Sequence, residues 1–171
     1  MYKHKGFTLI EIIITLAVIS ILVGISAPSY NHWISGYRLK AAIRNLRSNM
    51  QKARVMAISE NKTIEIRFDY SLSPGFYYFD TNDDNDYNIG EHKSDLASFG
   101  SKVDFGTGNA KTNWSNSSIN QAARVFFTSN GNSFPASIYL ENENKDVCYS
   151  ITTSNAGTIK IRKYDGDKWI N

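Results

Sequence analysis

An apolar run near the start of the chain places the strongest constraint on its fold. Residues 7–27 contain a single charged side chain, Glu11. As an α-helix rising about 1.5 Å per residue, this run would reach roughly 30 Å, the thickness of the hydrocarbon core of a bilayer. Two basic residues, Lys3 and Lys5, come before it. The run therefore predicts a membrane-spanning helix followed by an exported domain.

Glu11 does not suit a plain membrane anchor. A carboxylate inside a membrane costs on the order of several kcal/mol unless a cation pairs with it, and an uncleaved signal anchor gains nothing from it. A cleaved secretory signal is also disfavoured, because the run is too long and only a weak small-residue site at residues 25–27 follows it. Glu11 therefore needs a partner that a simple anchor does not supply.

The segment GFTLIE at residues 6–11 resembles the class III leader of type IV prepilins and pseudopilins. In that family a short basic leader ends in Gly, a Phe follows, and a Glu lies four residues after the Phe. The resemblance implies that a prepilin peptidase cuts between Gly6 and Phe7 and then methylates the Phe7 amine. It also implies that Glu11 pairs with this amine, on a neighbouring subunit or its own, during assembly. Pro28 matches the proline that interrupts the first helix of the family near the membrane exit.

The charges around the apolar run do not fix its orientation. Lys3 and Lys5 favour a cytoplasmic N-terminus, but several basic residues soon after the run favour the opposite. The resemblance implies a single-pass protein of the bacterial inner membrane with a cytoplasmic N-terminus and a periplasmic domain. The helix would contact membrane lipid first and other pilins or pseudopilins after assembly into a pseudopilus or pilus.

Beyond Pro28 the pattern is that of an amphipathic helix. Apolar residues recur at alternating spacings of four and three, and the helix is predicted to end near Ser59. These apolar residues are Leu39, Ile43, Leu46, Met50, Ala53 and Ala57. A second row, mainly basic, runs from Lys40 to Arg54, and each of its residues directly follows a residue of the apolar stripe. This row is either a solvated face or a surface that meets acidic groups of neighbouring subunits. The apolar stripe needs a sheet to cover it.

From Lys62 the apolar period changes to two, which is typical of half-buried strands. Strands are predicted at residues 62–69, 75–80, 102–105, 123–129, 137–142, 147–154 and 157–165, and a mobile polar loop at residues 106–120. The predicted fold class is α+β, with one long N-terminal helix packed on a C-terminal antiparallel β-sheet domain. The predicted parts are a leader (1–6), a transmembrane and assembly half of the helix (7–30), an amphipathic half (31–59) and a periplasmic globular domain (60–171).

The C-terminal half resembles the GspH/FimT branch of minor pilins and pseudopilins. The similarity rests on ARVFFTSNG, SIYLEN and VCYSITTSNAGTIKIRK, in that order, with Phe127, Gly131 and Gly157 at the positions of family residues. It implies a type IV pilin-like fold and a structural role as a minor pseudopilin of a type II secretion system. The alternative is a minor pilin of a type IV pilus with DNA binding for natural transformation. Family members often carry Arg after the last Gly, where this chain has Thr158.

An acidic segment, DTNDDNDYNIGE, suggests a cation site. Five oxygen-bearing residues stand at positions one, three, five, nine and twelve of a calcium-binding loop: Asp80, Asn82, Asp84, Asn88 and Glu91. The segment before it is typical of a strand, whereas an EF-hand loop follows a helix. The alternative is a solvated hairpin tip, and no cofactor other than this calcium is expected.

Basic residues near the C-terminus raise the question of DNA binding. Lys160, Arg162 and Lys163 supply positive charge, and Tyr164 and Trp169 offer rings for base stacking. The alternative is a strand that turns its basic residues to solvent, and the net charge of only +3 does not indicate a general nucleic-acid field.

The sequence contains no motif for catalysis. A nucleophile elbow, a phosphate loop and a paired metal motif are all absent. The single cysteine, Cys148, excludes an intrachain disulfide and is interpreted as a packed side chain. The chain is therefore predicted not to be an enzyme.

Overall fold

A computed structural model describes residues 6–100 and 102–170, without the side chains of residues 25–32. The chain divides into two compact units, Met1–Ile34 and Ser35–Asn171. The elements in chain order are α1 (Leu9–Ser59), β1 (Ile64–Asp69), β2 (Phe76–Asp80), β3 (Lys93–Asp95), the 3-10 helix η1 (Leu96–Phe99), β4 (Asp104–Phe105), β5 (Arg124–Phe127), β6 (Ser137–Glu141), β7 (Cys148–Thr153), β8 (Ile159–Tyr164) and β9 (Trp169–Ile170).

The first unit contains the N-terminal part of α1, whose large apolar side chains from Leu9 to Val23 are exposed. Within the described residues, no helix combines the length and the hydropathy required for a membrane span. Residues 25–27, the end of the predicted span, have side chains outside the described part, and so does Pro28.

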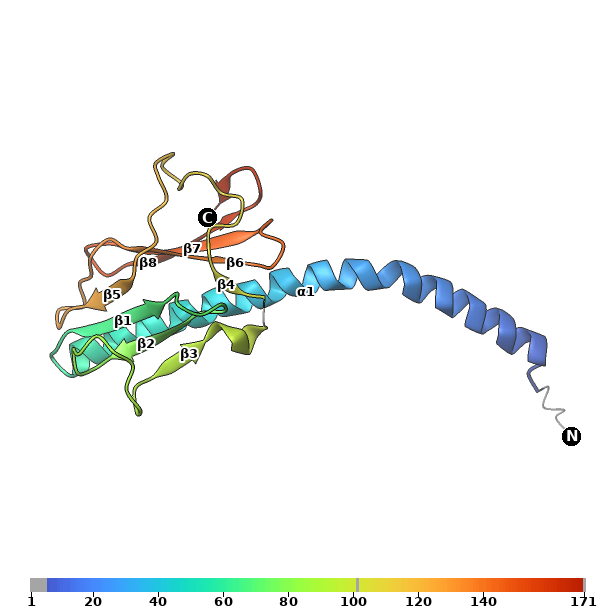
Figure 1. Ribbon diagram of the computed structural model, residues 1–171, viewed down its shortest axis with the longest axis horizontal. Coiled ribbons are helices and arrows are strands. Elements are labelled where there is room, and N and C mark those ends of the chain that lie inside the picture. Colours follow the sequence, from blue (N-terminus) through green and yellow to red (C-terminus); the bar gives the residue numbers. More distant parts are fainter. Residues whose placement is uncertain (1–5, 101, 171) are drawn as a thin grey trace, which may run out of the picture. The chain divides into compact units, whose positions relative to one another are not determined.

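The second unit is built around the C-terminal part of α1 (Figure 1). All six residues of the predicted apolar stripe are at most 1% exposed, and α1 ends at Ser59 as predicted. They form one core cluster with the inward residues of the strands, among them Ile66, Phe79 and Ile151. The helix–sheet packing predicted from the two periodicities is confirmed.

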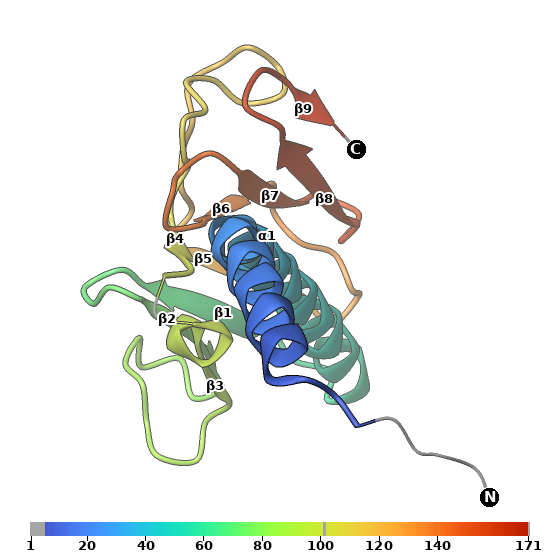
Figure 2. The ribbon, with the colours of Figure 1, turned by 90° about the vertical axis from the view of Figure 1, so that its right-hand side faces the viewer.

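Two antiparallel sheets cover the helix, where the sequence predicted one (Figure 2). Sheet A has the order β3-β2-β1-β5 and sheet B the order β4-β6-β7-β8-β9. Ala42 is buried beside Ile43. Since consecutive helix residues lie about 100° apart, the buried face of α1 is wider than one stripe and is covered from two directions.

Residues 121–123 join the two sheets. The N–H of Ala122 donates to the carbonyl of Ser137 in β6, and the carbonyl of Ala123 accepts from the N–H of Phe68 in β1. The side-chain amide of Gln121 makes two hydrogen bonds with the backbone of Tyr139: it accepts from the N–H at 3.0 Å and donates to the carbonyl at 3.2 Å. The segment therefore satisfies the open side of β6 where β4 ends.

Cys148 lies in β7 and is fully buried. Burial raises the pKa of its thiol to about 12, so the thiolate is disfavoured at neutral pH. Cys148 therefore acts as a packed side chain, as the sequence indicated.

Candidate functional site

The predicted cleavage site lies just before α1. Phe7 is 84% exposed and Gly6 is also exposed. A Cβ atom built on Gly6 would meet no atom within 4 Å. The fold therefore gives no steric reason for a glycine at this position.

Thr8 and Glu11 form a capping box at the start of α1. The N–H of Thr8 donates to Glu11 Oε2 at 2.8 Å, and the N–H of Glu11 donates to Thr8 Oγ1 at 3.3 Å. The Thr8 hydroxyl also donates to Glu11 Oε2, at 2.9 Å. These bonds satisfy backbone donors that no helical carbonyl can reach. The T-x-x-E spacing was visible in the sequence, so the capping role of Thr8 is a local feature that the pattern analysis missed.

Glu11 keeps one carboxylate oxygen for a further partner. Both hydrogen bonds from Thr8 end on Oε2, and Oε1 accepts none from the residues that the structure describes. The side chain is exposed, as are its apolar neighbours Ile10 and Ile12. Glu11 can therefore cap its own helix and face an outside cation at the same time.

At the other end of α1, Arg54 holds two turns together. Its Nε donates to the carbonyl of Gly131 at 2.8 Å, and its Nη2 donates to the carbonyl of Ala156 at 3.2 Å. Gly131 and Gly157 have φ angles of +74° and +69°, which favour glycine. A Cβ atom on Gly157 would overlap with the carbonyl oxygen of Gly131. The two glycines of the C-terminal pattern therefore meet each other and one arginine.

This contact divides the mainly basic row of α1. Lys40, Arg44, Arg47 and Gln51 are exposed, as the solvated-face alternative predicts. Arg54 is half-buried and is used inside the domain. The row as a whole is therefore not a free surface for neighbouring subunits.

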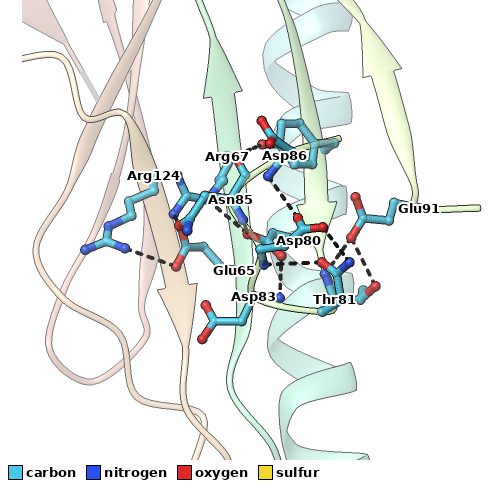
Figure 3. A network of polar contacts seen from close by, with 12 residues as sticks. Glu65, Arg67, Asp80, Thr81, Asp83, Asn85, Asp86, Glu91 and Arg124 are labelled. Atoms are coloured by element: carbon cyan, nitrogen blue, oxygen red, sulfur yellow. Dashed lines mark hydrogen bonds and ion pairs between the residues drawn. The ribbon is translucent and has the colours of Figure 1, made fainter. Parts of the chain in front are cut away.

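The acidic segment 80–91 is a loop held by its own backbone (Figure 3). Asp80 is 3% exposed, and its carboxylate accepts from the N–H groups of Asp83 at 2.7 Å and Asn85 at 3.0 Å. The same carboxylate accepts from Arg67 Nε at 3.1 Å. Since its oxygens already have donors, Asp80 anchors the loop.

The other carboxylates of the loop have separate donors. Glu91 accepts from the N–H groups of Thr81 at 2.9 Å and Asn88 at 3.0 Å. Asp84 accepts from the N–H of Asp86, and this bond lowers the pKa of Asp84. Among the described residues, no three acidic, histidine or cysteine side chains are grouped so that they could hold a metal. The calcium hypothesis stays a prediction, and these contacts favour the hairpin alternative.

Behind the loop, Arg67 is shared between two carboxylates on the outer face of sheet A. Its Nε lies 2.8 Å from Glu65 Oε1 and 3.1 Å from Asp80 Oδ2. The hydrogen bond goes to Asp80, and Glu65 Oε1 receives none from the described residues. Arg124 Nη1 lies 3.4 Å from the second oxygen of Glu65. Two cations and two carboxylates thus balance each other, which favours a structural role.

The structure separates the three basic residues considered for DNA binding. Lys160 and Arg162 pair across the ladder with Thr152 and Ser150, whereas Lys163 pairs with Tyr149. Because side chains alternate along a strand, Lys160 and Arg162 share one face of β8 and Lys163 lies on the other. The three therefore do not form one positive patch.

The rings considered for base stacking are also engaged. Trp169 Nε1 donates to the carbonyl of Thr112 at 2.7 Å, and its ring packs against Tyr164 and Trp114. Trp114 belongs to the loop predicted to be mobile, and its ring stacks on the buried Tyr139. These contacts, which the sequence did not predict, attach the loop to the outer face of sheet B. These rings act as internal packing.

Comparison with known proteins gives two family matches. Residues 1–27 match the prokaryotic N-terminal methylation motif. Residues 42–157 match the type II transport protein GspH family, and this match covers more than half of the chain. The chain belongs to the GspH family. No curated protein matches it.

Comparison with a solved structure shows the fold of this GspH family member. It is similar to the type IV minor pilin FimU of Pseudomonas aeruginosa, with 16% identity and a TM-score of 0.55 over 80% of this chain and 95% of FimU. The minor pseudopilin EpsH from the type 2 secretion system of Vibrio cholerae aligns with 16% identity and a TM-score of 0.47, over 72% of this chain and 95% of EpsH. The likeness to FimU shows the type IV pilin-like α+β fold that the sequence predicted.

Family membership also settles the class of function. This GspH family member is a minor pseudopilin or minor pilin, a structural subunit and not an enzyme, as the sequence predicted. The prepilin motif implies processing by a peptidase and anchoring in the inner membrane before assembly, and the family implies assembly with other pilins.

Proposed function

We propose that this protein is a minor pseudopilin of a type II secretion system. The match of residues 42–157 to the type II transport protein GspH family carries the proposal. The protein would sit in the inner membrane with its N-terminus in the cytoplasm and residues 60–171 in the periplasm. It would then join the pseudopilus, where its helix packs among the helices of other pseudopilins.

The start of α1 supports a defined assembly step. Cleavage after Gly6 would leave a cationic amine on Phe7, and methylation would keep it cationic. Docking beside another subunit would bring such an amine to Glu11 Oε1, while Oε2 stays in the capping box. In an apolar environment each ion offsets the desolvation cost of the other.

A chromosomal deletion tests the proposed system. The deletion strain should lose export of type II secretion substrates and keep its surface pili, and the wild-type gene should restore export. Loss of pili with normal export would instead identify a minor pilin of a type IV pilus.

Processing should occur between Gly6 and Phe7. N-terminal analysis of the protein extracted from membranes should find methylated Phe7 as the first residue. Gly6→Val should accumulate the uncut chain, because a branched side chain blocks close approach of the peptidase to this backbone, while the fold has room for it. A mature chain that starts at Met1 or after Ala27 would contradict the assignment.

Substitutions at the capping box should separate helix capping from assembly. Glu11→Gln keeps an oxygen that can accept the hydrogen bonds from Thr8 but removes the charge, and we expect it to be processed and to fail to enter filaments. Thr8→Ala removes the cap at a cost of about 1 kcal/mol, and we expect incorporation to continue. Co-purification with filament components measures both. Normal incorporation of Glu11→Gln would contradict pairing through charge.

A further inference from the structure

A cavity of about 390 Å³ opens on the outer face of sheet B. Its floor is a row of cross-strand neighbours, Ser137 in β6, Thr152 in β7 and Lys160 in β8. The alternate positions of these strands, such as Ile138 and Ile151, point into the core. The volume falls in the range of sites for small molecules.

The cavity is positively charged. Lys160 and Arg162 are its only charged lining residues, and neither forms an ion pair within the described part of the chain. Arg162 is held in place, because its guanidinium lies 4.4 Å from the ring centroid of Trp114 and its Nη1 donates to Thr152 Oγ1 at 3.2 Å. The remaining N–H groups of its planar fork are available to a carboxylate.

The rest of the lining suits a ligand with many hydroxyl groups. Ser137, Ser154 and Thr158 carry hydroxyls and Asn120 a carboxamide, and each of these groups both donates and accepts hydrogen bonds. Pro135 and neighbouring small residues give an apolar wall for the C–H face of a ring. A peptide strand cannot add here, because the floor is a sheet face whose backbone groups are used in the ladder.

We propose that this cavity binds an acidic sugar, a hexuronate unit whose carboxylate is held by Arg162 and Lys160. The ring hydroxyls then meet the serine, threonine and asparagine side chains. The site lies in the second unit, so it does not depend on which filament system the protein serves.

Calorimetric titration of the full-length protein tests the proposal. The protein should be held in a polyoxyethylene detergent, which carries no sugar headgroup. Digalacturonic acid should bind, and lactose and acetate should each bind at least about tenfold more weakly, since one lacks the charge and the other the ring hydroxyls. The absence of digalacturonate binding, or equal binding of either control, would overturn the proposal.

Two substitutions in β8 distinguish binding in this cavity from non-specific attraction of an anion to a positively charged protein. Lys160→Gln should weaken binding by about tenfold or more, as expected for loss of a charge-assisted hydrogen bond. Lys163→Gln changes the net charge equally, but lies on the opposite face of β8 and should leave binding unchanged. Lys160 is exposed and has no ion-pair partner among the described residues, so its substitution leaves the fold intact. Equal losses in the two variants would refute the site.

Discussion

Because the turns at Gly131 and Gly157 contact each other and Arg54, we expect Gly157→Ala to lower the free energy of unfolding by an unusually large amount. An alanine at φ +69° costs about 1–2 kcal/mol in backbone conformation. Its Cβ would also overlap with the carbonyl oxygen of Gly131 and lie 2.9 Å from Arg54 Nε. The turns must separate, and a hydrogen bond from the guanidinium, worth about 1.5–3 kcal/mol, is lost. We expect a total loss of about 2.5–5 kcal/mol.

Gly166→Ala is the matched control. Gly166 also has a positive φ, +101°, but a Cβ atom there would meet nothing within 4 Å. We expect it to cost only the conformational term, about 1–2 kcal/mol. Arg54→Met should remove the hydrogen bonds to the carbonyls of Gly131 and Ala156 without straining the backbone.

Thermal unfolding of the full-length protein, followed by circular dichroism, measures these differences. At about 3 °C per kcal/mol for a chain of this size, Gly157→Ala should lower Tm by roughly 8–15 °C and Gly166→Ala by roughly 3–6 °C. Equal shifts in the two variants would show that backbone conformation alone accounts for the cost of replacing Gly157. That result would refute the role given to its contact with Gly131 and Arg54.

Two further predictions concern pH and calcium. Partial burial against Phe79, together with the nearby Lys52, lowers the pKa of His92. The folded state therefore prefers neutral His92, and its contribution to stability should be present above about pH 6.5 and lost as pH falls through the lower folded-state pKa. His92→Gln should flatten the dependence of Tm on pH between 7.5 and 5, and an unchanged slope would count against this assignment. For calcium, binding at residues 80–91 would raise Tm by mass action, but the donors already on Asp80 lead us to expect equal Tm values in millimolar calcium and in excess chelator.

Local periodicity was sufficient to predict most of this fold. The stripe from Leu39 to Ala57 and the alternation of Ile64, Ile66 and Phe68 each depend on neighbours within a few residues, and both are buried as predicted. The strands that the sequence missed, β3 and β9, have three and two residues, too few to show a period.

The features that the sequence did not predict depend on contacts between distant residues. The division into two sheets depends on the pairing of β1 with β5, which no local pattern specifies. The role of Arg54 depends on carbonyls 77 and 102 residues further along the chain. Thr8 is different, because its capping partner lies three residues away and could have been read directly.

The amide of Gln121 has a consequence for a protein that assembles side by side with its relatives. An open strand edge is a template on which another chain can add a strand, and this risk grows when domains are crowded in a filament. Gln121 completes the backbone hydrogen bonds of Tyr139 with a side chain. The edge is closed at this residue without a further strand, so a neighbouring domain can touch it through side chains but cannot add a strand here.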